Sequence, residues 1–119
     1  ESEVVDLAFN FQDSRTGAPV RMGRFEITFF DVDQARGGRG RETLAVEGFE
    51  RYVVEDGHEL AIEDHGAGRA SFSSTRYGQG CDNPTDPLRL GVVTCRGNTV
   101  DQMKRSVMFL FANTTGFNA

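Results

Sequence analysis

The sequence has no tryptophan, a single lysine and only three prolines. Without tryptophan it lacks the Cys–Trp–Cys pattern of true immunoglobulin domains, which counts against that type of sandwich. No apolar stretch approaches the roughly 20 residues that a membrane-spanning helix needs. We therefore expect a chain that does not insert directly into a membrane.

Positive charge is also scarce. The 13 basic residues face 18 acidic ones, which gives a formal net charge of −5 at pH 7. Nucleic acids and anionic membranes select a basic surface, so we expect no nucleic-acid partner. All basic residues except Lys104 are arginine. Either guanidinium groups are needed for carboxylate, sulfate or aromatic contacts, or the coding sequence is biased toward arginine.

Recognisable catalytic motifs are absent too. There is no Gly-x-Ser-x-Gly motif before a helix, and no Cys/His pair has a residue to orient it. A chain of 119 residues has little room for a deep cleft besides its core. We expect a protein without enzymatic activity, with a small glycoside hydrolase that uses two facing carboxylates as the third alternative.

The two cysteines, Cys81 and Cys95, predict a disulfide, with two buried free thiols as the alternative. The bridge would close a loop of about 15 residues and stabilise the fold by about 3 kcal/mol. Neither cysteine has a second ligand at zinc-binding spacing. A disulfide is typical of secreted proteins or of an oxidising lumenal compartment. Asn113-Thr114-Thr115 matches the N-glycosylation pattern and predicts a glycan at Asn113 in such a compartment.

The chain begins at Glu1, without a starting methionine or an apolar leader. We expect it to be processed or trimmed from a longer protein, with any targeting segment removed. Nothing in it repeats, and no stretch has the composition of a linker, so we expect residues 1–119 to form one domain.

What the sequence does contain is short alternating segments, many of them built on its ten phenylalanines. In the segment 25–29, Phe25, Ile27 and Phe29 point to one side of an extended chain. Segments of this kind recur at intervals of roughly 8–14 residues, with turn residues between them, which is typical of a sandwich or barrel. We expect an all-β, antiparallel two-sheet sandwich that is jelly-roll-like, with an immunoglobulin-like sandwich as the second choice.

Two local signals refine this expectation. Asp56-Gly57 is a strong turn signal, and it predicts a hairpin that joins the segments 52–54 and 60–62. At most one short helix is expected, near residues 99–105, with Thr99 and Gln102 spaced as a capping box.

Acidic residues gather at the end of one strand and in one loop. Asp31 and Asp33 leave the strand 25–29 on the same side, and Glu42 follows in the next loop. Ca²⁺ prefers six to eight oxygen ligands from carboxylates, amides and carbonyls. We hypothesise a structural Ca²⁺ site, unlike an EF-hand in spacing, with ligands from Asp31, Asp33, Asp82, Asn83 and Asp86. The alternative is that these residues only end a strand and begin turns.

A second group of candidates concerns contact with a partner. The glycine-rich loop tip presents Arg36, Arg39 and Arg41, whose guanidinium groups suit a sulfate, a uronic acid or a partner carboxylate. The aromatic residues Tyr52, Tyr77 and Phe117 would form a platform for stacking a sugar if they were exposed together.

Several parts of the chain together resemble secreted β-sandwich modules of microbial and algal surfaces. They are the segments 25–33, 42–49 and 106–111, Tyr52, and Asp82-Asn83-Pro84. These modules are lectin-like or carbohydrate-binding jelly rolls in which Ca²⁺ often lies at strand ends. The resemblance implies a secreted or lumenal binding module for a glycan or a protein partner. The main alternative is a structural or assembly subunit of a larger extracellular or lumenal complex, without a small-molecule ligand.

Overall fold

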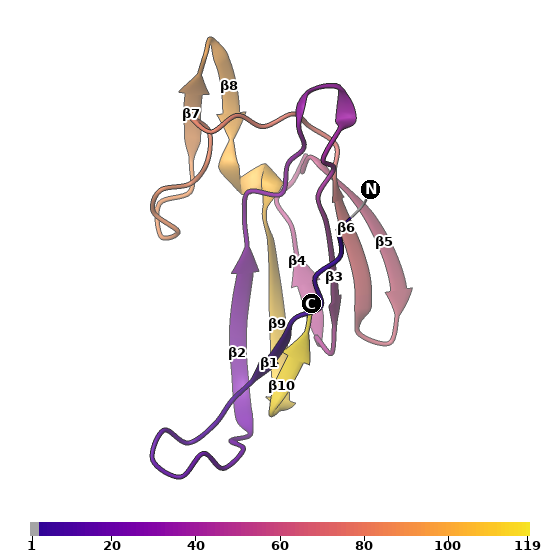
Figure 1. Cartoon of the computed structure of the whole chain (residues 1–119), viewed down its shortest axis with the longest axis vertical. Helices are drawn as coiled ribbons and strands as arrows, with labels where there is room; N and C mark the ends of the chain where they lie inside the picture. Colours follow the sequence, from indigo (N-terminus) through magenta and orange to yellow (C-terminus); the bar gives the residue numbers. More distant parts are fainter. Residues whose placement is uncertain (1–2) are drawn as a thin grey trace.

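The computed structural model describes residues 3–119, which fold into antiparallel β-strands joined by turns and two 3₁₀ helices (Figure 1). The strands are β1 (Ala8–Asn10), β2 (Met22–Phe29), β3 (Thr43–Glu47), β4 (Arg51–Val53), β5 (Leu60–Gly66), β6 (Arg69–Ser74), β7 (Val92–Cys95), β8 (Asn98–Asp101), β9 (Val107–Thr114) and β10 (Gly116–Asn118). The helices are η1 (Arg36–Gly38) and η2 (Gln102–Arg105). The expectation of an all-β fold is confirmed. No helix in this part of the chain is long and apolar enough to cross a membrane.

The strands form a five-stranded sheet, β1-β10-β3-β6-β5, a three-stranded sheet, β2-β9-β4, and a separate hairpin, β7-β8. In the five-stranded sheet, β1, β10, β3 and β6 lie side by side in this order, and in the three-stranded sheet β2 pairs with β9. This alternation between sheets follows jelly-roll order, in which antiparallel neighbours are far apart in sequence. One strand departs from it, because β5 lies beside β6 instead of extending the three-stranded sheet at β4.

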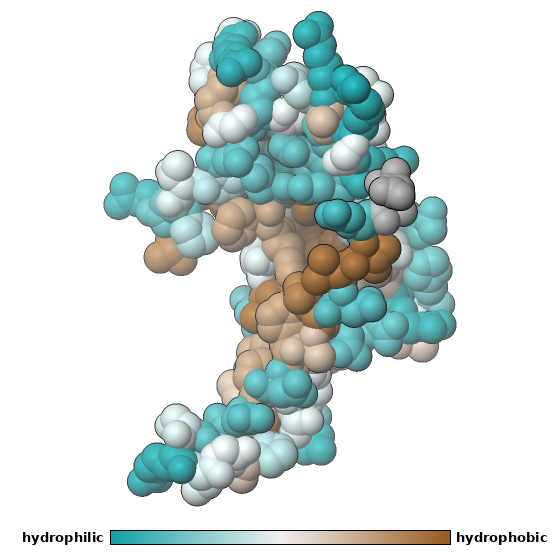
Figure 2. Space-filling view, in the orientation of Figure 1, coloured by the Kyte–Doolittle hydropathy of each residue, from teal (hydrophilic) through white to brown (hydrophobic). Residues whose placement is uncertain are grey.

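The two larger sheets pack face to face through aromatic side chains. In β9, Val107, Phe109 and Phe111 are buried and alternate with less buried neighbours, as a strand with one core face requires. The ring of Phe109 lies edge-on to Phe72 of the opposite sheet, with centroids 5.3 Å apart. Figure 2 shows apolar residues along the middle of one face of the molecule and polar residues at both ends.

The predicted hairpin at Asp56-Gly57 is wrong. Gly57 does adopt the positive φ of a turn, +68°, but β4 pairs with β9 and β5 pairs with β6. The turn therefore carries the chain from one sheet to the other. A turn signal is local, whereas the partner of each strand is decided by which sheet buries its apolar residues.

The short helix is confirmed, but its predicted start is wrong. Thr99 belongs to β8, and Asp101 caps η2 by accepting a hydrogen bond from the Met103 N–H at 3.1 Å. Asp101 provides the oxygen acceptor that suits an N-cap. The second 3₁₀ helix, η1, lies outside the expected region, in the glycine-rich loop.

The predicted disulfide is confirmed. Cys81 and Cys95 are bonded, with their Cα atoms 5.6 Å apart, and Cys95 is almost fully buried. The bond joins the long loop after β6 to the β7-β8 hairpin, which projects from the sandwich at the top of Figure 1. Since that hairpin pairs with neither large sheet, the disulfide is a main constraint on its position.

Replacing both cysteines with serine should lower the free energy of unfolding by about 3 kcal/mol, because the unfolded chain would lose the constraint on this loop. Urea denaturation of the oxidised protein and of the C81S/C95S variant measures the difference. Equal stability of the two proteins would show that the bridge adds nothing to the fold.

Candidate functional site

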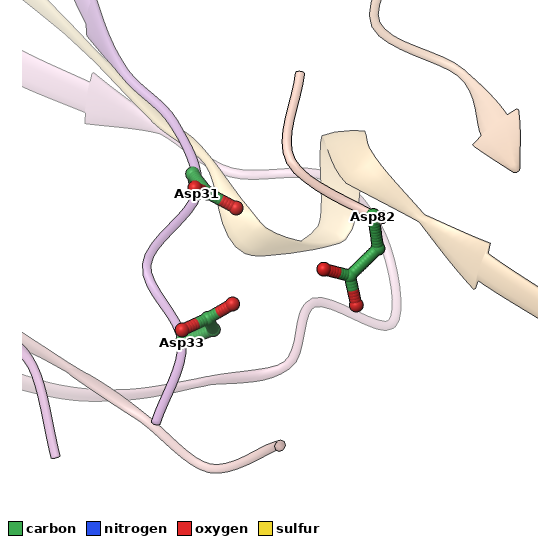
Figure 3. A group of neighbouring side chains, drawn as sticks. All are labelled: Asp31, Asp33 and Asp82. Carbon is green, nitrogen blue, oxygen red and sulfur yellow. The ribbon is translucent and has the colours of Figure 1, made fainter. Parts of the chain in front are cut away.

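Three aspartates meet where β2 ends and the loop between β6 and β7 passes. Figure 3 shows Asp31 and Asp33 on one segment and Asp82 on the other, with their carboxyl groups directed toward the space between them. One carboxylate oxygen from each residue lies within 4.8 Å of the other two. We call Asp31, Asp33 and Asp82 the aspartate cluster.

The backbone after β2 explains why two of these side chains lie together. Asp31 adopts a positive φ of 67°, which bends the chain out of the strand. Val32 is buried, and its N–H donates to the carbonyl of Arg105 at 3.1 Å. With Val32 anchored in the core, Asp31 and Asp33 on either side of it lie away from the core.

The loop that carries Asp82 is held against this segment by main-chain hydrogen bonds. Gln34 donates to the carbonyl of Arg76 at 3.2 Å, and Gly78 donates to the carbonyl of Gln34 at 3.0 Å. A Cβ on Gly78 would lie only 1.4 Å from an Asp33 carboxylate oxygen. Glycine at this position is therefore what leaves room for the Asp33 carboxylate.

Asp82 is almost fully buried and is held by specific hydrogen bonds. Its carboxylate accepts from the Gln79 N–H at 2.8 Å and from Nη1 of Arg105 at 3.2 Å. Arg105 is itself buried and also donates from Nε to Glu59 at 2.8 Å. The Gln102 side chain donates to the carbonyl of Asp82 at 3.0 Å. Asp82 is therefore a fixed member of the cluster.

The environment of the cluster disfavours the charged form of Asp31 and Asp33 and raises the pKa of both. Burial, followed by the nearby charges of Asp31, Glu42 and Asp82, raises the pKa of Asp33 to about 6. Burial also raises the pKa of Asp31, and the charges of Asp82 and Glu42 raise it further. Arg105 opposes both shifts only in part, because its side-chain ion pairs are with Asp82 and Glu59.

The other predicted ligands are divided. Asn83 lines the same hollow as Asp31 and Asp33, together with Glu42, whose carboxylate accepts from the Asp33 N–H at 3.3 Å. Asp86 lies outside the cluster. Its carboxylate accepts from the Leu88 N–H at 3.0 Å and pairs with Arg89 at 3.4 Å, as a turn-initiating aspartate does.

The predicted partner-contact residues do not form one surface. Tyr52 packs among the phenylalanines between the sheets, edge-on to Phe72 with centroids 5.0 Å apart. A joint platform of Tyr52, Tyr77 and Phe117 is therefore wrong, because Phe117 is also buried and only Tyr77 of the three is exposed. The three predicted arginines are all exposed, and Nε of Arg41 also donates to the Ser74 carbonyl at 3.0 Å.

The predicted glycosylation residue, Asn113, is exposed at the end of β9. It has a positive φ of 57°, and its carbonyl accepts from Nη1 of Arg21 at 2.6 Å. The asparagine therefore lies at a turn, where an acceptor side chain is accessible.

Sequence reasoning missed two residues on which the cluster depends, Arg105 and Gly78. Arg105 lies in a basic stretch next to Lys104 with nothing to distinguish it, and Gly78 is one of several loop glycines. Their roles depend on where two distant loops cross.

Comparison of the chain with protein-family models finds no match, and comparisons with curated proteins and with solved structures find no significant match. The arrangement of the site therefore has to be interpreted from its own chemistry. Ligand oxygens around one Ca²⁺ lie about 2.3–2.6 Å from the ion, so two of them are separated by at most about 5 Å. Oxygens within 4.8 Å of one another satisfy that limit.

The raised pKa of Asp33 predicts how the metal-free protein responds to pH. Between its unfolded value near 3.8 and about 6, the folded state binds more protons than the unfolded state. The free energy of unfolding should therefore fall as pH rises through this window. Because the Asp33 side chain is partly exposed, solvent screening limits its contribution to about 1 kcal/mol.

Urea denaturation between pH 4 and pH 7 in the presence of a chelator measures this slope. Asp33→Asn should flatten it and should make the metal-free protein more stable at pH 7. An unchanged slope in that variant would contradict the assignment of the shift to Asp33.

Gly78→Ala tests the packing of the Asp33 carboxylate against the loop. The added Cβ would overlap that carboxylate, so either the side chain or the loop has to move. We expect a loss of about 1–3 kcal/mol of stability, as for other overpacked positions. Gly80→Ala is a matched control in the same loop, because a Cβ there has no atom within 4 Å. Equal effects of the two substitutions would contradict the close approach.

Proposed function

We propose that this chain is a non-catalytic binding module in which the aspartate cluster holds a Ca²⁺ ion that fixes the surrounding loops. The observation that carries the proposal is the approach of three carboxylates to within 4.8 Å with a single arginine beside them. That arginine pairs with Asp82, and neither Asp31 nor Asp33 has an ion pair among the described residues. A divalent cation would supply the missing positive charge.

The chemistry of the donors favours Ca²⁺ over Mg²⁺. The hollow offers carboxylate oxygens and the Asn83 amide, in a loop whose path is irregular. Ca²⁺ accepts such flexible arrangements, whereas Mg²⁺ requires near-octahedral geometry at about 2.0–2.1 Å. The spacing also suits a metal better than hydrolysis, since the paired carboxyl groups of glycosidases are about 5–9.5 Å apart.

The ion would hold together two loops that are far apart in the sequence, the loop after β2 and the loop between β6 and β7. Asp31 and Asp33 follow β2, and Asp82 directly follows the disulfide-bonded Cys81. Near the same end of the molecule lie the η1 loop and the projecting β7-β8 hairpin (Figure 1). Loops presented by a rigid sandwich are typical binding elements. Arg36, Arg39 and Tyr77 are exposed here and would contact a glycan or a protein partner.

We further propose a secreted or lumenal location. The disulfide is consistent with an oxidising environment, and the exposed acceptor Asn113 fits the same route. Extracellular modules bind Ca²⁺ with dissociation constants of about 10⁻⁴–10⁻³ M, and we expect an affinity in this range.

The second candidate function, an assembly subunit, is favoured by an apolar hollow on the three-stranded sheet. Its walls include Phe30 and Met108 on one side and Leu88 and Met103 on the other. Leu88 is 92% exposed, and Phe30 and Met103 are each more than one-third exposed. Exposed apolar groups of this size favour a protein partner over a glycan.

A thermal melt of the oxidised protein with millimolar Ca²⁺, and then with excess chelator, tests the main proposal. At one to ten times its dissociation constant the ion stabilises the fold by about 0.4–1.4 kcal/mol, which raises the melting temperature by up to several degrees at this size. Asp33→Asn should abolish the shift. Asp86→Asn is the matched control, because Asp86 lies in the same loop but outside the cluster, and it should keep the shift.

No shift in the wild-type protein would overturn the Ca²⁺ site and leave the assembly subunit as the candidate to pursue. A shift that survives Asp33→Asn but is lost in Asp86→Asn would place the ion elsewhere in the loop.

A further inference from the structure

The free edge of β2 is the longest unpaired strand edge of the three-stranded sheet. β2 runs over eight residues and, within residues 3–119, pairs only with β9, without a break in register from Arg24 to Phe29. Figure 1 shows no strand on its other side. Long, regular edges are templates for pairing with another chain, and natural proteins usually shorten, bend or cover them.

The direction of the main-chain groups along this edge can be deduced from β9. The Leu110 carbonyl of β9 accepts from the N–H of Glu50, which directly precedes β4, so the main-chain groups of Leu110 face β4. Because these groups alternate along a strand, the odd-numbered residues of β9 face β2. Their partners in β2, such as Phe25 opposite Phe111, are also odd-numbered.

The even-numbered residues of β2 therefore direct their N–H and C=O groups away from β9. These residues are Met22, Arg24, Glu26 and Thr28. The main-chain groups of all four are available for one further strand. An antiparallel partner has to meet them with a matching set of outward-facing groups.

The side chains of the same residues are self-complementary. Arg24 and Glu26 are exposed and lie two positions apart, so they share the outer face of the sheet. Across β9 their neighbours are Ala112 and Leu110, and neither charge has an ion pair among the described residues. In a symmetric antiparallel pair of two β2 strands, Arg24 of each copy can lie opposite Glu26 of the other.

We propose that two copies of this chain associate through their β2 edges, with Phe25 on the two-fold axis and Arg24 opposite Glu26 of the second copy. This register also places Met22 opposite Thr28, so the even-numbered residues form about eight main-chain hydrogen bonds. Shifting the two-fold axis to Arg24 or to Glu26 would place like charges opposite each other, which is unfavourable. The inner faces would bring together Phe25 and Ile27, which are only partly buried in the single chain.

The test is sedimentation equilibrium of the oxidised protein between about 1 µM and about 1 mM. We expect a reversible dimer. Arg24→Glu and Glu26→Arg should each raise its dissociation constant by about tenfold, because two symmetric attractions become repulsions. The double variant R24E/E26R should restore it. Arg69→Glu, an exposed position on β6 of the other large sheet, is the control and should leave it unchanged.

Amide hydrogen exchange provides a second measurement that does not depend on these variants. Raising the protein concentration should slow exchange at Arg24, Glu26 and Thr28 and leave Phe25 unchanged, since its N–H already faces β9. A monomer over the whole range would overturn the proposal, as would a dimer that is insensitive to R24E. Failure of the double variant to recover the dimer would overturn the register. Pairing of β2 with an extended peptide of another protein, without self-association, would also overturn it.

Discussion

The arrangement at this end of the molecule depends on the ion pairs of Arg105. This side chain is buried and reaches Glu59 ahead of β5 and Asp82 in the loop after β6, while its carbonyl accepts from Val32 after β2. Three segments from different parts of the chain are thereby held at one point. A buried ion pair adds little net stability, but removing one partner costs about 3–5 kcal/mol because a charge stays buried without compensation. The main effect of Arg105 is therefore on the path of the loops, and the net contribution of its ion pairs to the free energy of unfolding is small.

The single positive charge of Arg105 does not neutralise the carboxylates that lie around it. Asp31, Asp33 and Glu42 lie beside Asp82, and their repulsion together with burial keeps the pKa of Asp33 near 6. The main chain contributes strain at the same place, since Asp31 holds a positive φ. Strain and uncompensated charge are typical of functional sites, and the proposed cation would relieve the charge. This is why the cluster, rather than the exposed arginines or Tyr77, carries the functional proposal.

Much of the fold was predictable because strand periodicity is a local property. The alternation around Phe25 and Phe109 identifies strands whatever their partners are, and Cys81 and Cys95 were the only pair available for a disulfide. The hairpin at Asp56-Gly57 failed because strand pairing depends on burial far away in sequence. At the site, the spacing of Asp31 and Asp33 was informative, and Asp82 and Asp86 looked alike. Asp82 differs from Asp86 only because its part of the loop passes beside the segment after β2. The roles of Gly78 and Arg105 also depend on this contact between the two segments.

Calcium binding measured by titration calorimetry at pH 6, in two buffers of different ionisation enthalpy, tests the central claim most directly. Because the pKa of Asp33 is about 6, roughly half of its carboxyl groups carry a proton at that pH and have to lose it when the ion binds. The account predicts one binding site per chain and an observed enthalpy that differs between the two buffers, with the difference disappearing near pH 8. Binding without proton release at pH 6, or no binding at all, would contradict it.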